Sequence, residues 1–142
     1  MFQVGSVFVP VTNLEKSKKW YEEHLDVQQI DGWEGGAGFF FPHGSAQLGL
    51  IEVSNPQPTE FIIEKNQKNV YFNFVVADID AAHKKLNDSG VETTEIHKFG
   101  GMQYFDFFDP DQNAFSVVDE DLNSPYHKEN VRKQQEKIRT RQ

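Results

Sequence analysis

One pattern occurs twice in this chain, and the repetition constrains the possible fold more than any other feature. The stretch FVPVTNLEKSKKWYEEHLDV near the start resembles FNFVVADIDAAHKKLNDSGV in the middle of the 142-residue sequence. Asn13 matches Asp78, and Gly35 matches Gly100, each at a spacing of 65 residues. Several matches in one order and at one spacing predict two copies of the same structural unit.

Both copies contain the same order of helix and strand signals. A stretch rich in β-branched and aromatic residues, which predicts a strand, comes first in each copy. A helix follows: the TNLE sequence at 12–15 matches a capping box, Asp78 can cap the second helix, and Gly90 can end it. Turns containing Gly or Pro then divide the rest of each copy into three strands. The predicted order is β-α-β-β-β, occurring twice.

This order predicts an α+β fold in which the whole chain forms one domain. The first βαβββ module is expected at 1–54 and the second at 70–120. A Pro-containing linker, whose EFIIE sequence can form a short strand, is expected at 55–69. A basic tail follows at 121–142, where Ser124 is the expected N-cap of a helix.

The two modules are expected to create a cleft. A four-stranded sheet with a single helix leaves one face uncovered, and one module alone cannot bury that face. Two curved, mixed sheets with their free faces turned toward each other would enclose a space between them. Such a space is the usual kind of site for a small molecule.

Charge is distributed unevenly along the chain, whose net charge is −8. Residues 121–142 contain six Lys or Arg and three Asp or Glu, whereas residues 1–120 contain eight and nineteen. An acidic body repels the phosphates of nucleic acids, so we expect no nucleic-acid partner. The basic tail is interpreted as a solvated helix end, although it could also contact an acidic partner.

Composition excludes several other classes. Cysteine is absent, so the chain has no disulfides, no thiolate nucleophile and no cysteine metal ligands. No apolar run reaches the length of a membrane span, and the N-terminal stretch lacks the features of a signal peptide. We therefore expect a cytoplasmic protein that does not enter a membrane.

Three motifs resemble those of a known superfamily. They are VTNLEKSKKWY, ADIDAAHKKLNDSGV and FFDPDQN, and they extend over about residues 4–120. Together they are similar to the motifs of the vicinal oxygen chelate superfamily, which includes glyoxalase I, extradiol dioxygenases, and fosfomycin and bleomycin resistance proteins. The resemblance implies paired βαβββ modules around a cupped site, and a homodimer.

The resemblance also implies four positions at which metal-dependent members hold a divalent metal. In this sequence the positions fall on Ser6, Glu52, Tyr71 and Ser116. Zinc sites use His, Cys or carboxylate ligands, so Glu52 is the only good ligand among the four. We therefore expect no metal site of the usual kind, and no metal ligand is assigned.

A remodelled metal site is the alternative to a missing one. His43 and His97 lie in expected loop or strand-end positions, from which either could approach the mouth of the cleft. The simpler interpretation is that both are exposed loop histidines.

Strand alternation suggests which side chains face the cleft. Ile51 and Val53 are expected to pack on the helix, which places Leu50 and Glu52 on the cleft side. A carboxylate among aromatic groups can act as a general base, with Tyr71 assisting as a hydrogen-bond donor. The other expected ligand-binding residues on this side are Ser6, Phe8, Asn73, Ser116 and Val118.

These features leave three functions open. The first is a protein that binds a small, partly hydrophobic organic molecule without metal, like the sequestering resistance proteins. The second is a lyase, isomerase or dioxygenase of the glyoxalase type in which Glu52 acts as a base or as a ligand of a remodelled metal site. The third is a regulatory or interaction module without catalysis.

Overall fold

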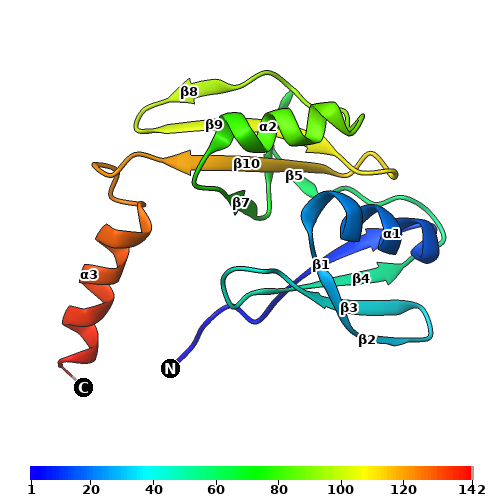
Figure 1. The fold of residues 1–142 in the computed structure, drawn as a ribbon, viewed down its shortest axis with the longest axis horizontal. Coiled ribbons are helices and arrows are strands. Elements are labelled where there is room, and N and C mark those ends of the chain that lie inside the picture. Colours follow the sequence, from blue (N-terminus) through cyan, green and yellow to red (C-terminus); the bar gives the residue numbers. More distant parts are fainter. Residues whose placement is uncertain (142) are drawn as a thin grey trace.

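Two units of one topology follow each other in the computed structural model, which describes residues 1–141 (Figure 1). The first consists of β1 (Ser6–Val11), α1 (Leu14–Leu25), β2 (Gln28–Trp33), β3 (Gly36–Phe40) and β4 (Gln47–Glu52). The second consists of β7 (Asn73–Val75), α2 (Ile79–Asp88), β8 (His97–Phe99), β9 (Met102–Phe108) and β10 (Ala114–Glu120). The predicted order of two β-α-β-β-β units is confirmed.

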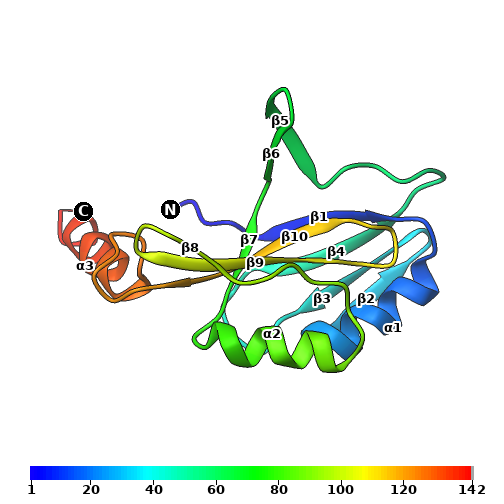
Figure 2. The same ribbon diagram turned by 90° about the horizontal axis from the view of Figure 1, so that it is seen from above.

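Each unit forms a mixed four-stranded sheet. The strand orders are β1-β4-β3-β2 and β7-β10-β9-β8, with β1 parallel to β4 and β7 parallel to β10. Both α1 and α2 lie on the same side of the two sheets (Figure 2). We call the opposite, uncovered side the open face; on the edge strands it carries Ser6 and Phe8 of β1, and Asn73 and Val75 of β7.

One hydrophobic core joins the helix-facing sides of both units. The ring of Trp20 in α1 stacks on Phe107 of β9 at 6.2 Å, so the helix of the first unit packs on the sheet of the second. Tyr21, also in α1, makes an edge contact with Phe115 of β10 at 6.3 Å. The two units therefore share their core. Its completely buried apolar members are Val9, Val11, Tyr21, Ala37, Phe39, Leu48, Leu50, Phe105 and Phe107.

The helices begin at residues with capping side chains. The side chain of Asn13 accepts a hydrogen bond from the Lys16 amide at 3.1 Å. Asp78 accepts one from the Ala81 amide at 3.0 Å, as predicted. The predicted capping box at 12–15 is wrong, because the cap is Asn13 and the Thr12 hydroxyl bonds elsewhere.

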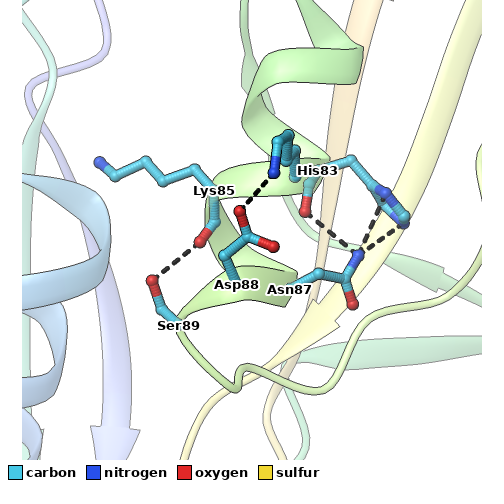
Figure 3. Close-up of polar contacts among 6 residues, drawn as sticks. His83, Lys85, Asn87, Asp88 and Ser89 are labelled. Carbon is cyan, nitrogen blue, oxygen red and sulfur yellow. Dashed lines mark hydrogen bonds and ion pairs between the residues drawn. The ribbon is translucent and has the colours of Figure 1, made fainter.

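Polar contacts close the C-terminal end of α2 (Figure 3). Ser89 Oγ donates to the Lys85 carbonyl at 2.8 Å, and Asn87 Nδ2 donates to the His83 carbonyl at 3.2 Å. Gly90 follows with a φ of 82°, a left-handed conformation that suits glycine, so its predicted position at the helix end is confirmed. The His83 ring reaches the Thr94 carbonyl at 2.8 Å and thereby ties α2 to the segment before β8.

The linker between the units contains a hairpin that the sequence indicates only in part. Strands β5 (Glu60–Glu64) and β6 (Gln67–Val70) pair antiparallel and project from the open face (Figure 2). The expected strand at the start of the second module is therefore divided, since β6 ends at Val70 and β7 begins at Asn73. Ile62 and Ile63 of the hairpin are 73% and 58% exposed.

The tail helix starts later than predicted. Helix α3 (Lys128–Arg139) has His127 as its N-cap, not Ser124. The Ser124 hydroxyl instead donates to Glu120 at 2.7 Å and accepts from the Tyr126 amide at 3.2 Å, so it belongs to the turn before the helix. Helix α3 has no buried residue and stands away from the two sheets (Figure 1). Within residues 1–141, no helix has both the length and the apolar character needed to cross a membrane.

Candidate functional site

The turn between β9 and β10 fastens the two units together. Tyr21 Oη of α1 donates to Asp109 Oδ2 at 2.6 Å. Asn113 Nδ2 donates to the Pro10 carbonyl at 2.9 Å and also to Asp109 at 2.9 Å. The bonds to Tyr21 and Pro10 join residues about a hundred positions apart in the sequence, so the Asp-Pro-Asp turn holds β1 beside the second unit.

A second carboxylate of the same turn binds the start of α1. Asp111 accepts a hydrogen bond from the Thr12 amide at 3.0 Å, and a short one from the Thr12 hydroxyl. The open faces of both units are thereby fixed relative to each other, which is a requirement for a binding site formed from both.

Burial perturbs both partners of the Tyr21–Asp109 pair. Burial, and then the negative charge of Asp109, raises the pKa of Tyr21 well above its usual value. Burial raises the pKa of Asp109, although hydrogen bonds from Tyr21, Asn113 and Asp111 act in the opposite direction. The pair lies inside the core between the units and has no access to the open face, so we assign it a structural role.

The structure corrects the expected orientation of Leu50 and Glu52. Parallel pairing places Leu50 beside Val9 and Glu52 beside Val11, and both valines are completely buried under the helices. Leu50 is also completely buried in the core. The expectation that Leu50 and Glu52 line the cleft is wrong, because their side of β4 is the one that the helices cover.

Glu52 instead supports a helix. Its Oε2 accepts a hydrogen bond from the Leu14 amide, at the first turn of α1, at 2.8 Å. A carboxylate at a helix N-terminus satisfies an amide that has no partner within the helix and interacts favourably with the helix dipole. This contact takes Glu52 away from the open face, where a general base or a metal ligand would have to act.

Register also identifies which residue of the first unit corresponds to Ser116. In the second unit Ser116 pairs with Asn73, which lies five residues before the helix N-cap Asp78. In the first unit the residue five positions before the N-cap Asn13 is Phe8, and Phe8 pairs with Gly49. The position equivalent to Ser116 is therefore occupied by Gly49, not by Glu52.

An aromatic ring covers this glycine. A Cβ atom placed on Gly49 would lie 2.5 Å from the ring of Phe8, which shows that the ring rests directly on the backbone. The ring of Trp33 rests on Gly36 in the same way, again at 2.5 Å. Phe8 and Trp33 are both more than half exposed, so the open face of the first unit presents aromatic surface over a glycine floor.

The open face of the second unit carries a row of polar side chains. Asp106 of β9, Ser116 of β10 and Asn73 of β7 lie side by side, because the three strands pair in this register. Ser116 Oγ donates to Asp106 Oδ1 at 2.6 Å. Val118 shares this face by alternation but is almost fully buried, so it offers little surface to a ligand.

A groove lies where the first unit, the linker and the start of the second unit meet. We call it the linker groove; its volume is about 510 Å³. Phe8 and Tyr71, two of the residues expected at the site, line it together with apolar linker and strand residues. Its lining consists of Val7, Phe8, Val9, Pro10, Ile51, Val53, Gln57, Pro58, Thr59, Tyr71 and Phe72.

A second hollow, of about 760 Å³, lies beside α3. It is lined by residues of the tail, among them Leu122, Asn130 and Lys137, and by none of the residues expected at the site. Because the linker groove joins the open face and this hollow does not, we place the candidate site at the linker groove and the polar row beside it.

The residues at the family's metal positions do not fit a metal. Ser6, Gly49, Tyr71 and Ser116 offer three neutral hydroxyl groups and one residue without a side chain, whereas catalytic zinc sites keep about three His, Cys or carboxylate ligands. Throughout residues 1–141, no three His, Asp or Glu side chains lie close enough together to hold a metal ion.

The histidines considered for a remodelled site do not alter this. His97 is exposed on β8 with its ring 5.6 Å from that of Tyr104, and His43 is exposed in the turn between β3 and β4.

Two residues of this site were missed from the sequence. Asp106 lies three positions before the Asp-Pro-Asp turn, and its place opposite Ser116 follows only once the β9–β10 register is known. Gly49 was missed because the resemblance to the family placed the last-strand position of the first unit on Glu52. The sequence did contain a signal for the orientation of Asp106. It lies between Phe105 and Phe107, two apolar residues that the structure places in the core, so alternation puts Asp106 on the opposite face.

Comparison with known proteins identifies the family. A family model described as Glyoxalase/Bleomycin resistance protein/Dioxygenase superfamily matches residues 3–117. No curated protein sequence matches the chain.

Solved structures of other proteins share the fold. The antibiotic binding protein TnmS3 from Streptomyces sp. CB03234 is 18% identical, with a TM-score of 0.67 over 84% of this chain and 97% of that one. A superfamily member from Sphaerobacter thermophilus DSM 20745 is 22% identical, with a TM-score of 0.67 over 84% and 98%. The fosfomycin resistance protein FosX from Listeria monocytogenes is 15% identical, with a TM-score of 0.66 over 86% and 96%. At these identities the likeness concerns the fold alone, whereas the family match extends over most of the sequence. The chain belongs to the Glyoxalase/Bleomycin resistance protein/Dioxygenase superfamily.

Proposed function

We propose that this protein binds a small, partly hydrophobic organic molecule on its open face, without a metal ion of the kind used by the metal-dependent family members. The observation that carries the proposal is the replacement of the family's ligand positions. They hold Ser6, Gly49, Tyr71 and Ser116, and an aromatic ring covers the glycine. These positions offer hydroxyl groups and aromatic surface, which suit an organic molecule better than a cation of high charge.

The linker groove supports the same function. Its walls are mostly apolar, and its polar groups come from a few side chains such as Tyr71, Thr59 and Gln57. Ligand sites commonly combine apolar walls with a small number of polar groups that orient the ligand. TnmS3 is an antibiotic binding protein and FosX a fosfomycin resistance protein, so the shared fold is compatible with recognition of small organic molecules.

We further propose that the protein acts as a homodimer. Phe8 and Tyr71 on the open face are 62% and 67% exposed, and Ile62 of the projecting hairpin is exposed as well. Large apolar patches are uncommon on the surfaces of monomers and mark sites of association or ligand binding. A second copy of the chain over part of the open face would cover Ile62 and add a wall to the groove, so that Phe8 and Tyr71 face an enclosed ligand.

The enzymatic alternative lacks a supporting contact. A lyase, isomerase or dioxygenase reaction would use Glu52 as base or metal ligand, with Tyr71 assisting. Glu52 binds the Leu14 amide on the helix side of the sheet, which leaves Tyr71 on the open face without this carboxylate.

Three measurements test the proposal. Elemental analysis of protein purified without chelators should find no stoichiometric Zn, Ni, Fe or Mn; one divalent metal per chain would contradict it. A thermal-shift screen of hydrophobic metabolites and antibiotics should find compounds that raise the melting temperature, because a ligand that binds only the folded state stabilises it. Sedimentation analysis should give the mass of a dimer, and a strictly monomeric protein would remove the homodimer from the proposal.

A further inference from the structure

Asp106 occupies an unusual place on the open face. Its neighbours in β9, Phe105 and Phe107, are completely buried toward the helices, so alternation turns Asp106 to the other side. The residue is half-buried there. An acidic side chain in the middle of a sheet face must lose part of its hydration, which is unfavourable unless another group replaces the water.

The backbone of Asp106 is held firmly. Its amide donates to Thr94 Oγ1 at 2.8 Å, and the Thr94 amide donates to its carbonyl at 2.8 Å. Both bonds come from the segment that leads into β8. The backbone that carries the carboxylate is therefore held by Thr94 on one side of β9 and by β10 on the other.

The carboxylate itself is only partly satisfied. Its Oδ1 accepts the hydroxyl of Ser116 at 2.6 Å, which orients the group. The ion pairs found among residues 1–141 involve Glu15, Glu23, Asp26, Asp88, Glu129 and Glu136, and none involves Asp106. The charge of Asp106 is therefore not balanced by a cation of the same chain within that range.

The surroundings are suited to an organic cation. Asn73 lies beside Ser116 on the next strand, and Tyr71 lies two residues before Asn73, in the bend between β6 and β7. The Tyr71 ring is mostly exposed, packs 5.2 Å from that of Phe61 and lines the linker groove. The Tyr71 ring offers an apolar face to the body of a ligand, and the net charge of −8 favours the approach of a cation.

The spacing of the strands sets the size of the ligand. Neighbouring strands lie roughly 4.8 Å apart, so Asp106 on β9 lies about 10 Å from the β7 edge, beyond which Tyr71 and the groove begin. A molecule that uses both places needs an apolar ring system and a charged end separated by a short chain.

We propose that Asp106, oriented by Ser116, binds the ammonium group of an amphiphilic organic amine whose apolar body extends toward Tyr71 and the linker groove. This assignment rests on the proposed function and specifies the chemical class of its ligand. It makes the Asp106–Ser116–Asn73 row the part of the site that selects for charge, and the groove the part that selects for apolar bulk.

Three probes with the same apolar body test the charge selectivity. Each carries a naphthyl ring on a four-carbon chain, which ends in a primary amine, an alcohol or a carboxylate. Affinity is measured by calorimetry at pH 7 and low salt. The amine is expected to bind about tenfold more tightly than the alcohol and the carboxylate most weakly, as for a charged hydrogen bond partly screened by water. Added NaCl should weaken binding of the amine and leave the alcohol unchanged.

Variants connect the selectivity to Asp106. Asp106→Asn keeps the shape of the side chain and its ability to accept from Ser116, and should bring the amine to the affinity of the alcohol. Ser116→Ala should weaken amine binding by a smaller factor, since the carboxylate loses its orientation but keeps its charge. Glu22→Gln removes an equal charge from the exposed side of α1 and should leave all three affinities unchanged.

The outcomes separate the ammonium site from the binding function. Equal binding of the three probes to the wild-type protein, or equal loss of all three in Asp106→Asn, would overturn the ammonium site while leaving the binding function in place. Binding of none of the three, together with no response in the thermal-shift screen, would overturn the binding function itself. The selectivity of the wild-type protein decides between these outcomes even if Asp106→Asn fails to fold.

Discussion

The hydroxyl of Tyr21 lies 2.6 Å from the carboxylate of Asp109, and this bond joins α1 of the first unit to the last turn of the second. Both residues are buried, with Tyr21 completely enclosed. The Asp-Pro-Asp turn is therefore more than the connection of a hairpin. It also joins the two modules through buried hydrogen bonds.

Tyr21→Phe is expected to lower the free energy of unfolding by about 1–3 kcal/mol, because the buried Asp109 carboxylate would lose a hydrogen-bond donor. Urea unfolding measures this change. Tyr126→Phe is the matched control, since Tyr126 is 79% exposed and should change stability very little. Equal stability of Tyr21→Phe and the wild-type protein would show that the bond contributes nothing to holding the units together.

The same pair predicts a dependence on alkaline pH. Burial, and the charge of Asp109, raise the pKa of Tyr21 well above its usual value of 10.0. Above that pH the phenol ionises in the unfolded chain but stays protonated in the folded protein, so stability falls as pH rises. One such proton lowers the free energy of unfolding by about 1.4 kcal/mol per pH unit.

Tyr21→Phe lacks this proton, so its free energy of unfolding should decline less steeply above pH 10 than that of the wild-type protein. Unfolding by urea at a series of pH values from about 9 upward compares the two. Parallel declines would argue against a raised pKa at Tyr21.

Glu52 provides a test of helix support against catalysis. Glu52→Ala should cost about 0.5–1 kcal/mol of stability, because the Leu14 amide at the first turn of α1 loses its acceptor. Glu52→Gln retains an acceptor and should cost less. Glu64→Ala, at an exposed site in the hairpin, should be neutral.

Ligand binding gives the contrasting measurement for Glu52. The thermal shifts produced by hits from the screen should persist in Glu52→Gln, since its carboxylate lies on the helix side of the sheet. Loss of those thermal shifts in a folded Glu52→Gln protein would show that Glu52 takes part in ligand binding.

The contact between Phe8 and Gly49 predicts a coupling between two positions. Gly49→Ala places a methyl group 2.5 Å from the Phe8 ring, so the ring must move. We expect a loss of about 1 kcal/mol in the wild-type background and almost none in a Phe8→Ala background. Gly5→Ala serves as control, because a Cβ at Gly5 would meet no atom within 4 Å. Equal effects of Gly49→Ala in both backgrounds would show that the ring does not rest on the glycine.

Local signals were sufficient to predict the repeated fold. The repeat of Asn13 and Asp78 marks both helix starts, and both side chains cap their helices. The position of Gly90 depends only on its own backbone conformation, which is also local. The start of α3 was predicted wrongly from local signals. Ser124 and Pro125 resemble a helix start, but the Ser124 hydroxyl donates to Glu120 in the folded protein.

The orientation of β4 could not be predicted from its own residues. Leu48 and Leu50 are apolar on one side, and Ile51 and Val53 are apolar on the other, so alternation gives no preference. The side toward the helices is determined by pairing with β1, where Val9 and Val11 are buried. Residues Ser6, Phe8, Asn73 and Ser116 were placed on the open face because they alternate with core residues of one consistent side.

The rings of Phe8 and Trp33 have a consequence for how this surface can change. Gly49 and Gly36 have no side chains of their own, and the rings of Phe8 and Trp33, from neighbouring strands of the sheet, lie over their backbone. The shape of this surface therefore depends on the side-chain torsion angles of Phe8 and Trp33. A rotation of one ring, or a single substitution at position 8 or 33, would therefore change the shape of this surface while every strand keeps its register.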